Sequence, residues 1–129
     1  MSDIPGDLKY TRSHEWVRLE EDGSVTIGIT HHAQGSLGEL VYVEVPDVGS
    51  ELSPGEACAV VESVKAASDV YAPVEGVIVE VNDALADQPE LINEQPYDDG
   101  WIMRFGEVNH DTLAELIDSD AYLASIEDE

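Results

Sequence analysis

Basic side chains are the scarcest feature of this sequence. Only 5 Lys and Arg residues stand against 29 Asp and Glu residues, which gives a formal net charge of -24 at pH 7. A surface with this balance repels phosphate backbones and anionic lipid headgroups, so it disfavours both nucleic-acid binding and membrane binding. We interpret the charge as an adaptation to a salty cytoplasm, because high ionic strength shortens the range of self-repulsion. The alternative interpretation is an acidic protein suited to basic faces on its partners.

Cysteine and long apolar runs are also nearly missing. The single cysteine, Cys58, excludes an intramolecular disulfide and a cysteine-rich zinc site, and its apolar neighbours indicate a small buried side chain. No stretch approaches the roughly 20 apolar residues that are needed to cross a bilayer. The first seven residues lack the basic and apolar regions of a signal peptide. We therefore expect a cytoplasmic protein that spans no membrane.

Short alternating or apolar runs cover most of residues 16–105 and indicate a mainly β domain. The clearest predicted strands are 25–29, 40–45, 57–61, 77–81 and 101–105. Segments rich in Gly, Pro and Asp separate them, which favours a sandwich or barrel with short connections. Two runs, 38–45 and 76–81, resemble each other, because each consists of Gly followed by an alternating strand. This internal similarity predicts a roughly two-fold flattened barrel. A chain of 129 residues suits one core, so we expect a single domain over 1–129.

Two segments break the strand pattern. Thr30 suits the N-cap of a short helical turn over 31–34, which Gly35 or Gly38 would end. Apolar residues at helical spacing predict a C-terminal helical segment over about 110–127. Helices are therefore additions to the β core.

Lys65 is the only Lys or Arg between residues 19 and 103. Strands predicted at 57–64 and 67–72 place it at the tip of a hairpin, where several enzymes in turn can reach a long side chain. An amine is the nucleophile that accepts an activated acyl group, and lysine supplies a flexible four-carbon stem. A solvated surface charge is the ordinary alternative for a loop lysine, and a Schiff-base lysine would need a desolvated pocket. We therefore predict that Lys65 is acylated.

Two carboxylates flank this lysine in the sequence. Glu62 lies three residues before Lys65 and Asp69 lies four residues after it. Each carboxylate offers a negatively charged contact by which a modifying enzyme can recognise the hairpin.

Motifs along the chain carry a family resemblance. They are Leu8-Lys9-Tyr10, Ser13-His14-Glu15-Trp16, Gly28-Ile29-Thr30, His32-Ala33-Gln34, Leu37-Gly38-Glu39, the run from Glu62 through Ser63-Val64-Lys65-Ala66 to Pro73, Gly76, Val81-Asn82, Leu91-Ile92-Asn93, and Pro96-Tyr97-Asp98-Asp99-Gly100-Trp101. In this combination the chain resembles the H proteins of the glycine cleavage system from near its start to its end.

The resemblance implies a flattened barrel-sandwich hybrid of the lipoyl/biotinyl type with short added helices, including C-terminal helices. It implies a monomeric, non-catalytic carrier with lipoate attached covalently to Lys65 by a lipoate ligase or lipoyl transferase. Such a carrier takes the aminomethyl group of glycine from a pyridoxal-phosphate glycine decarboxylase to an aminomethyltransferase. A dihydrolipoyl dehydrogenase then reoxidises the arm.

The resemblance also implies a cleft that receives the loaded arm. The matching positions here are Ser13, Glu15 and Asp69. Glu15 or Asp69 would hold the protonated amine by a charge-assisted hydrogen bond. Without the family, Ser13 would be interpreted as a turn residue, Glu15 as a surface charge and Trp16 as a core or rim residue.

Other functions fit the sequence less well. His31 and His32 are adjacent and would point about 100° apart on a helix, so no metal site is expected. Biotinyl domains usually set methionines on both sides of the lysine, whereas Val64 and Ala66 flank Lys65. No paired acid and base, phosphate loop or nucleophile motif indicates an enzyme. A role as lipoate donor, in a relay to other 2-oxoacid dehydrogenases, stays open as the alternative within the same family.

Overall fold

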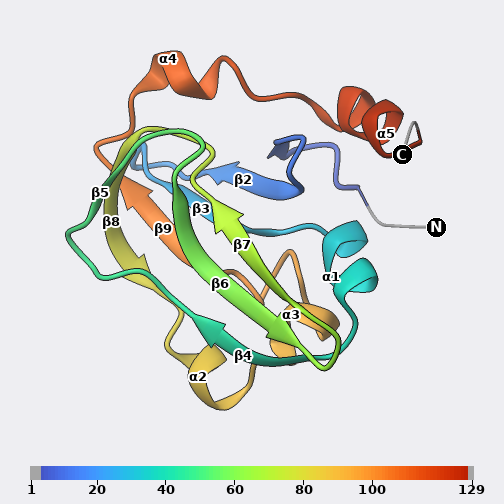
Figure 1. Cartoon of the computed structure of the whole chain (residues 1–129). Coiled ribbons are helices and arrows are strands. Elements are labelled where there is room, and N and C mark those ends of the chain that lie inside the picture. The colour runs from blue at the N-terminus through green and yellow to red at the C-terminus, as the bar shows by residue number, and fades with distance from the viewer. Residues whose placement is uncertain (1–3, 128–129) are drawn as a thin grey trace.

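The structure is a computed structural model that describes residues 4–127. Its strands are β1 (Lys9–Tyr10), β2 (Glu15–Leu19), β3 (Val25–Ile29), β4 (Leu40–Glu44), β5 (Glu51–Leu52), β6 (Ala57–Ser63), β7 (Ala67–Tyr71), β8 (Gly76–Val81) and β9 (Met103–Gly106). Its helices are α1 (His31–Leu37), α2 (Ala84–Asp87), α3 (Leu91–Glu94), α4 (His110–Leu113) and α5 (Ser119–Glu127), as Figure 1 shows. The expectation about a signal peptide falls partly on Met1–Asp3, which lie outside the described residues.

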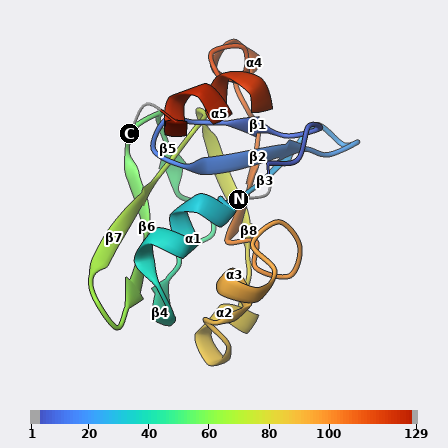
Figure 2. The same cartoon turned by 90° about the vertical axis from the view of Figure 1, so that its right-hand side faces the viewer.

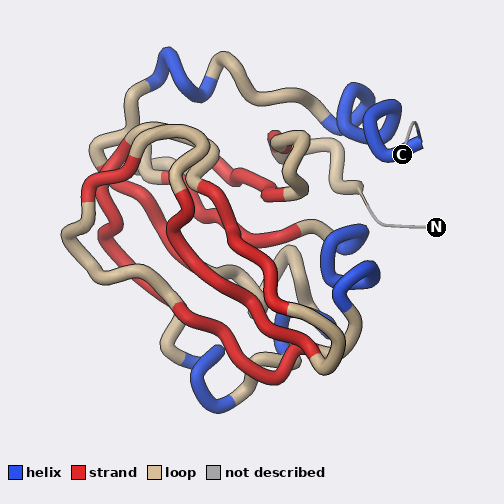
Figure 3. The backbone as a smooth tube through the Cα atoms, viewed as in Figure 1, coloured by secondary structure: helices blue, strands red, loops and turns tan. Residues whose placement is uncertain are grey.

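The strands form two antiparallel sheets. One sheet has the order β1-β2-β3-β9-β8-β5 and the other has the order β4-β6-β7. Figure 3 shows the strands stacked in two layers with the helices at their margins. The two similar runs become β4 and β8, one in each sheet. This arrangement confirms the predicted mainly β fold of the flattened barrel-sandwich type with short added helices.

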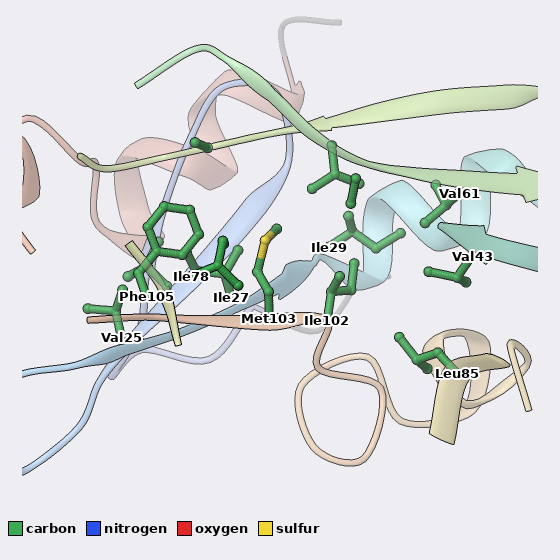
Figure 4. Packing of buried hydrophobic residues seen from close by; sticks show 14 of the residues in the cluster. Val25, Ile27, Ile29, Val43, Val61, Ile78, Leu85, Ile102, Met103 and Phe105 are labelled. Atoms are coloured by element: carbon green, nitrogen blue, oxygen red, sulfur yellow. The ribbon is translucent and has the colours of Figure 1, made fainter. Parts of the chain in front are cut away.

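The main hydrophobic core lies between the two layers (Figure 4). All five residues of β3 are buried, because this strand lies inside its sheet with β2 on one side and β9 on the other. Ile27, Ile78 and Phe105 are fully buried at one end of this core, and Val43 and Val61 of the smaller sheet lie at its other end. Burying an aliphatic or Phe side chain contributes roughly 1.5–3 kcal/mol, so this core supplies the principal stabilisation.

A second cluster covers the outer face of the larger sheet. Trp16 is fully buried, which confirms it as a core residue, and its Nε1 donates to the carbonyl of Pro96 at 2.8 Å. Trp16 lies directly over Gly28, where an added Cβ would come within 2.8 Å of the indole ring. The rings of Tyr10 and Tyr122 stack with centroids 4.8 Å apart, which fastens α5 to β1. The cluster therefore ties the C-terminal helix to the sheet.

Several element boundaries differ from the sequence prediction. α1 continues past Gly35 to Leu37, so the helix is longer than the predicted turn over 31–34, and Gly38, one of its two predicted ends, is its C-cap. Thr30 caps its start as expected, because its side chain accepts from the backbone N–H of Ala33. β9 begins at Met103, two residues later than predicted, and just before it the side chain of Asn82 donates to the carbonyl of Trp101 at 2.7 Å.

The C-terminal helical segment consists of two helices, α4 and α5. The short helices α2 and α3 and the strands β1, β2 and β5 had no counterpart in the prediction. Cys58 is half-buried at the margin of the core, not fully buried. Within residues 4–127, no helix is long and apolar enough to cross a membrane.

Candidate functional site

Lys65 lies in the exposed turn between β6 and β7, as the strands predicted at 57–64 and 67–72 imply. The N–H of Ser63 donates to the carbonyl of Ala66 at 2.8 Å and closes the turn. The hydroxyl of Ser63 accepts from the N–H groups of Lys65 and Ala66, each at 3.1 Å. Ser63 therefore shapes the turn from inside, and the Lys65 side chain is left accessible.

The hairpin tip rests against the corner between α1 and β4 (Figure 2). The N–H of Val64 donates to the carbonyl of Glu39 at 3.2 Å. Gly38 has a φ of 86°, which suits glycine, and an added Cβ here would lie 3.0 Å from Cε of Lys65. The absence of a side chain at Gly38 thus leaves room for the stem of the lysine.

Asn93 of α3 clamps this corner. Its Oδ1 accepts from the N–H of Leu40 at 2.9 Å. Its Nδ2 donates to Oε1 of Gln34 at 2.8 Å and to the carbonyl of Gly38 at 2.9 Å. One amide therefore fixes the end of α1 and the start of β4, against which the hairpin tip is held.

A cleft of about 280 Å³ lies beside the hairpin. Its walls come from the segment before and at the start of β2, from α1 and from β7. Ser13, Glu15 and Asp69 all line it, so the structure brings together the three residues that the resemblance selects. Ser36 and Leu37 continue the wall to Gly38, where the lysine stem lies. Glu62 is half-buried on β6 and does not line the cleft.

Glu15 is 1% exposed, so its interpretation as a surface charge is wrong. One carboxylate oxygen accepts from the hydroxyls of Thr11 at 2.6 Å and Ser13 at 2.5 Å, and the other accepts from the N–H of Tyr71 at 3.3 Å. Burial raises the pKa of Glu15 above its ordinary value, and the hydrogen bonds from Ser13 and Thr11 oppose this shift. All three donors are neutral, so they satisfy the oxygen atoms without supplying a positive charge.

The cleft contains residues that the sequence did not single out as functional. His14 has a φ of 74°, and its Nδ1 lies 2.8 Å from the hydroxyl of Tyr122, which lies 2.7 Å from the hydroxyl of Thr30. The rings of His14 and His32 have centroids 4.9 Å apart. The spacing of His32, Ala33, Ser36 and Leu37 along α1 places them on one helical face, and this spacing is the signal that could have found them.

Two further chemistries, metal binding and thiol chemistry, depend on His, Cys, Asp and Glu side chains. Within residues 4–127, no three His, Cys, Asp or Glu side chains are grouped as metal ligands. Burial raises the pKa of Cys58 to about 12, and the negative charges of Glu15 and Glu56 add to the effect. A thiol with this pKa forms little thiolate near neutral pH, so Cys58 is a poor nucleophile towards a disulfide.

Comparisons with known proteins agree with one another and cover nearly all of the chain. The family model described as glycine cleavage H-protein matches residues 8–129. The chain is 59% identical over 129 residues to the glycine cleavage system H protein of Halorhodospira halophila, covering 100% of this chain and 99% of that protein. It is 57% identical over 129 residues to the H protein of Salmonella arizonae, covering 100% of both chains. The crystal structure of an H protein from Mycobacterium marinum matches with a TM-score of 0.86 at 41% identity, covering 96% of this chain and 99% of that one. The chain therefore belongs to the glycine cleavage H-protein family.

Proposed function

We propose that this chain is the lipoyl carrier of the glycine cleavage system and performs no catalysis itself. Family membership supports the role, and one structural observation carries the assignment of the site. Lys65 is exposed at a hairpin tip, with its stem against Gly38, next to the cleft that Ser13, Glu15 and Asp69 line. The lysine therefore has the access that attachment needs and a neighbouring place to store cargo.

The lysine suits an amide link to lipoate. An exposed amine is open to an acylating enzyme. A Schiff-base lysine needs a desolvated pocket, whereas Lys65 is exposed to solvent. When bound, the lipoyl group supplies a disulfide that opens to carry the aminomethyl group and closes again on oxidation. Ser63 and Gly38 hold the backbone and the stem so that this group starts beside the cleft.

Glu15 is the residue that we assign to the amine of the carried aminomethyl group. Its carboxylate is buried and receives hydrogen bonds from neutral donors only, so an ammonium group in the cleft would supply the missing positive charge. The ion pairs seen within residues 4–127, Arg18 with Glu20 and Arg104 with Glu80, do not involve it. Asp69 is exposed at the margin of the cleft and would attract the cation as it enters.

The partners follow from the carrier role. Glycine decarboxylase would load the arm, aminomethyltransferase would unload it, and dihydrolipoyl dehydrogenase would reoxidise it. A lipoate ligase or lipoyl transferase would attach the group. Tethering gives the arm a high effective concentration in each docked complex, which is what a carrier contributes to rate.

A lysine substitution tests the attachment site. Protein purified from its native host should show a lipoyl addition by intact mass. Lys65→Ala should abolish both the addition and the glycine-dependent exchange of carbon dioxide with purified glycine decarboxylase. Lys9→Ala is the matched control, because Lys9 is the other lysine of the chain and is also exposed. A native protein that lacks the addition and still supports the exchange would contradict the proposal.

Some expectations remain predictions. They are the single domain over 1–129, the monomeric state, the cytoplasmic location and the alternative role in lipoate relay. The relay role uses the same lysine, and transfer of the lipoyl group from purified carrier to a 2-oxoacid dehydrogenase domain would separate it from the glycine cleavage role.

A further inference from the structure

The edge of the smaller sheet carries an irregularity next to the modified hairpin. β4 pairs with β6, but the register shifts between Leu40 and Tyr42, which marks a β-bulge. In a regular strand, Val41 and Tyr42 would point to opposite faces. Here both side chains are exposed, Val41 by 53% and Tyr42 by 51%. The bulge therefore presents two apolar side chains to solvent where regular pairing would bury one.

Val64 extends this apolar surface to the hairpin tip. It is 69% exposed and directly precedes Lys65. Its N–H bonds to the carbonyl of Glu39, and Leu40 is paired with Ser63, so the start of β4 and the tip lie side by side. We name Val41, Tyr42 and Val64 the β4-edge patch. A cluster of exposed apolar side chains beside the attachment site indicates an interaction surface.

Carboxylates surround the β4-edge patch. Glu39 and Glu44 are exposed on the same edge, and Glu62 pairs directly with Tyr42 across the sheet. Between residues 19 and 103, Lys65 is the only Lys or Arg. The complementary partner therefore has an apolar or aromatic centre with Lys and Arg around it.

The patch and the cleft lie on opposite edges of the smaller sheet. The strand order is β4-β6-β7, the patch is built on β4 and the tip, and the cleft is lined by β7 together with α1. A protein docked on the β4-edge patch would approach Lys65 from the side of β4, whereas the cleft is lined from the side of β7 and α1. The two surfaces can therefore serve different steps.

Attachment is the step that requires contact at the lysine itself. The unprotonated Nζ attacks the carbonyl carbon of an acyl adenylate and forms the C–N bond. The bond between that carbon and the phosphate oxygen breaks, so AMP leaves, and the amine loses a proton to a base. The enzyme's active site must close around Nζ, so the enzyme must rest on residues next to Lys65. Enzymes that act on the cargo meet it at the far end of the arm.

We propose that the β4-edge patch is the docking surface for the enzyme that attaches the lipoyl group to Lys65, a partner with an apolar centre ringed by basic residues. This proposal rests on the proposed carrier function. It assigns to Val41 and Tyr42 a role in recognition, in addition to the role that the sequence predicts for Glu62.

Lipoylation kinetics test the patch. Unmodified chain is titrated into a purified lipoate ligase with ATP and lipoate, and attachment is followed by intact mass. Tyr42→Thr and Val41→Thr keep residues that favour strands. Each should raise KM for the chain about tenfold, a loss of one ordinary anchor contact, and leave kcat within about twofold. Glu44→Gln should raise KM at low salt and have no effect at 1 M KCl, because the contact is screened.

Matched controls are Leu19→Thr and Val48→Thr, which replace side chains that are 59% and 62% exposed outside the patch. Neither should change KM. If the patch variants are modified as well as wild type, or if the controls are impaired equally, the proposal is wrong. It is also wrong if fully lipoylated patch variants lose activity only with glycine decarboxylase, because the surface then belongs to that enzyme. A wild-type chain that accepts no lipoyl group would instead overturn the proposed function, and this proposal with it.

Discussion

Glu15 shows how one buried carboxyl links the cleft to pH. Because burial raises its pKa in the folded state, the folded chain holds more protons than the unfolded chain between the ordinary pKa and the raised one. The contribution of Glu15 to the free energy of unfolding therefore falls as pH rises through that window. We expect Glu15→Gln to remove this dependence, so that the stability of wild type relative to the variant decreases from pH 4 towards pH 7 in urea titrations.

Ser13→Ala provides the companion experiment. The hydrogen bond from Ser13 lowers the pKa of Glu15, so its loss should raise that pKa further and extend the window to higher pH. Equal pH profiles for wild type, Glu15→Gln and Ser13→Ala would contradict this account of Glu15. The same urea titrations on lipoylated protein loaded with the aminomethyl group should show a narrower pH range of Glu15-dependent stability. A cation in the cleft favours the ionised form of Glu15 and so lowers its pKa.

At the scale of elements, the corner between α1 and β4 depends on Asn93. Asn93→Asp keeps the acceptor for the N–H of Leu40 but sets a carboxylate oxygen against Oε1 of Gln34 and the carbonyl of Gly38. We expect a loss of about 1–3 kcal/mol in the free energy of unfolding, since two half-buried acceptors lose their donor. Urea denaturation of the purified variant measures it.

Asn109→Asp is the matched control for this clamp. Asn109 is exposed, caps α4 through Oδ1, and donates to Glu75 through Nδ2 at 2.8 Å. Aspartate serves as a cap equally well, so the control should cost less than about 1 kcal/mol. A larger loss at Asn109 than at Asn93 would mean that the corner between α1 and β4 is not the more sensitive site.

The elements also show how far the sequence could predict the structure. Alternating strands such as β3 and β8 were predictable, because burial on one or both faces leaves a clear pattern in the sequence. The four-residue helices α2 and α3 are too short for helical spacing to show. The extension of α1 past Gly35 depends on its packing, which overrides the low helix propensity of glycine.

The residues of the candidate site also differ in how far the sequence could predict their positions. The position of Lys65 at a hairpin tip followed from strand lengths and charge, both of which are local properties. The burial of Glu15 did not, because it depends on β7 and the Tyr71 N–H, which lie 56 residues further along the chain. The selection of Ser13, Glu15 and Asp69 came from family resemblance. The spacing of His32 along α1 was present in the sequence, but its contact with His14 became visible only in three dimensions.

For the whole molecule, the dominant property is the net charge of -24. Charges of one sign repel over about 10 Å at 0.1 M salt and over about 3 Å at 1 M, so folding should become more favourable as KCl rises. The free energy of unfolding from urea titrations should increase between 0.05 M and 1 M KCl. A flat or falling response would contradict the interpretation as adaptation to a salty cytoplasm.

A charge-neutralising variant separates this repulsion from other effects of salt. Glu51, Glu75 and Glu107 are exposed and line one groove at the β5–β8 edge. Neutralising Glu51 and Glu107 together, as Glu51→Gln and Glu107→Gln, removes like charges from around Glu75 and should stabilise the fold by roughly 0.5 kcal/mol at 0.05 M KCl. Screening should erase the gain at 1 M KCl, because wild type then no longer experiences the repulsion that the variant lacks. If the variant were equally stabilised at both salt concentrations, the gain would come from local packing, and the salt response of the wild-type chain would need a cause other than its net charge.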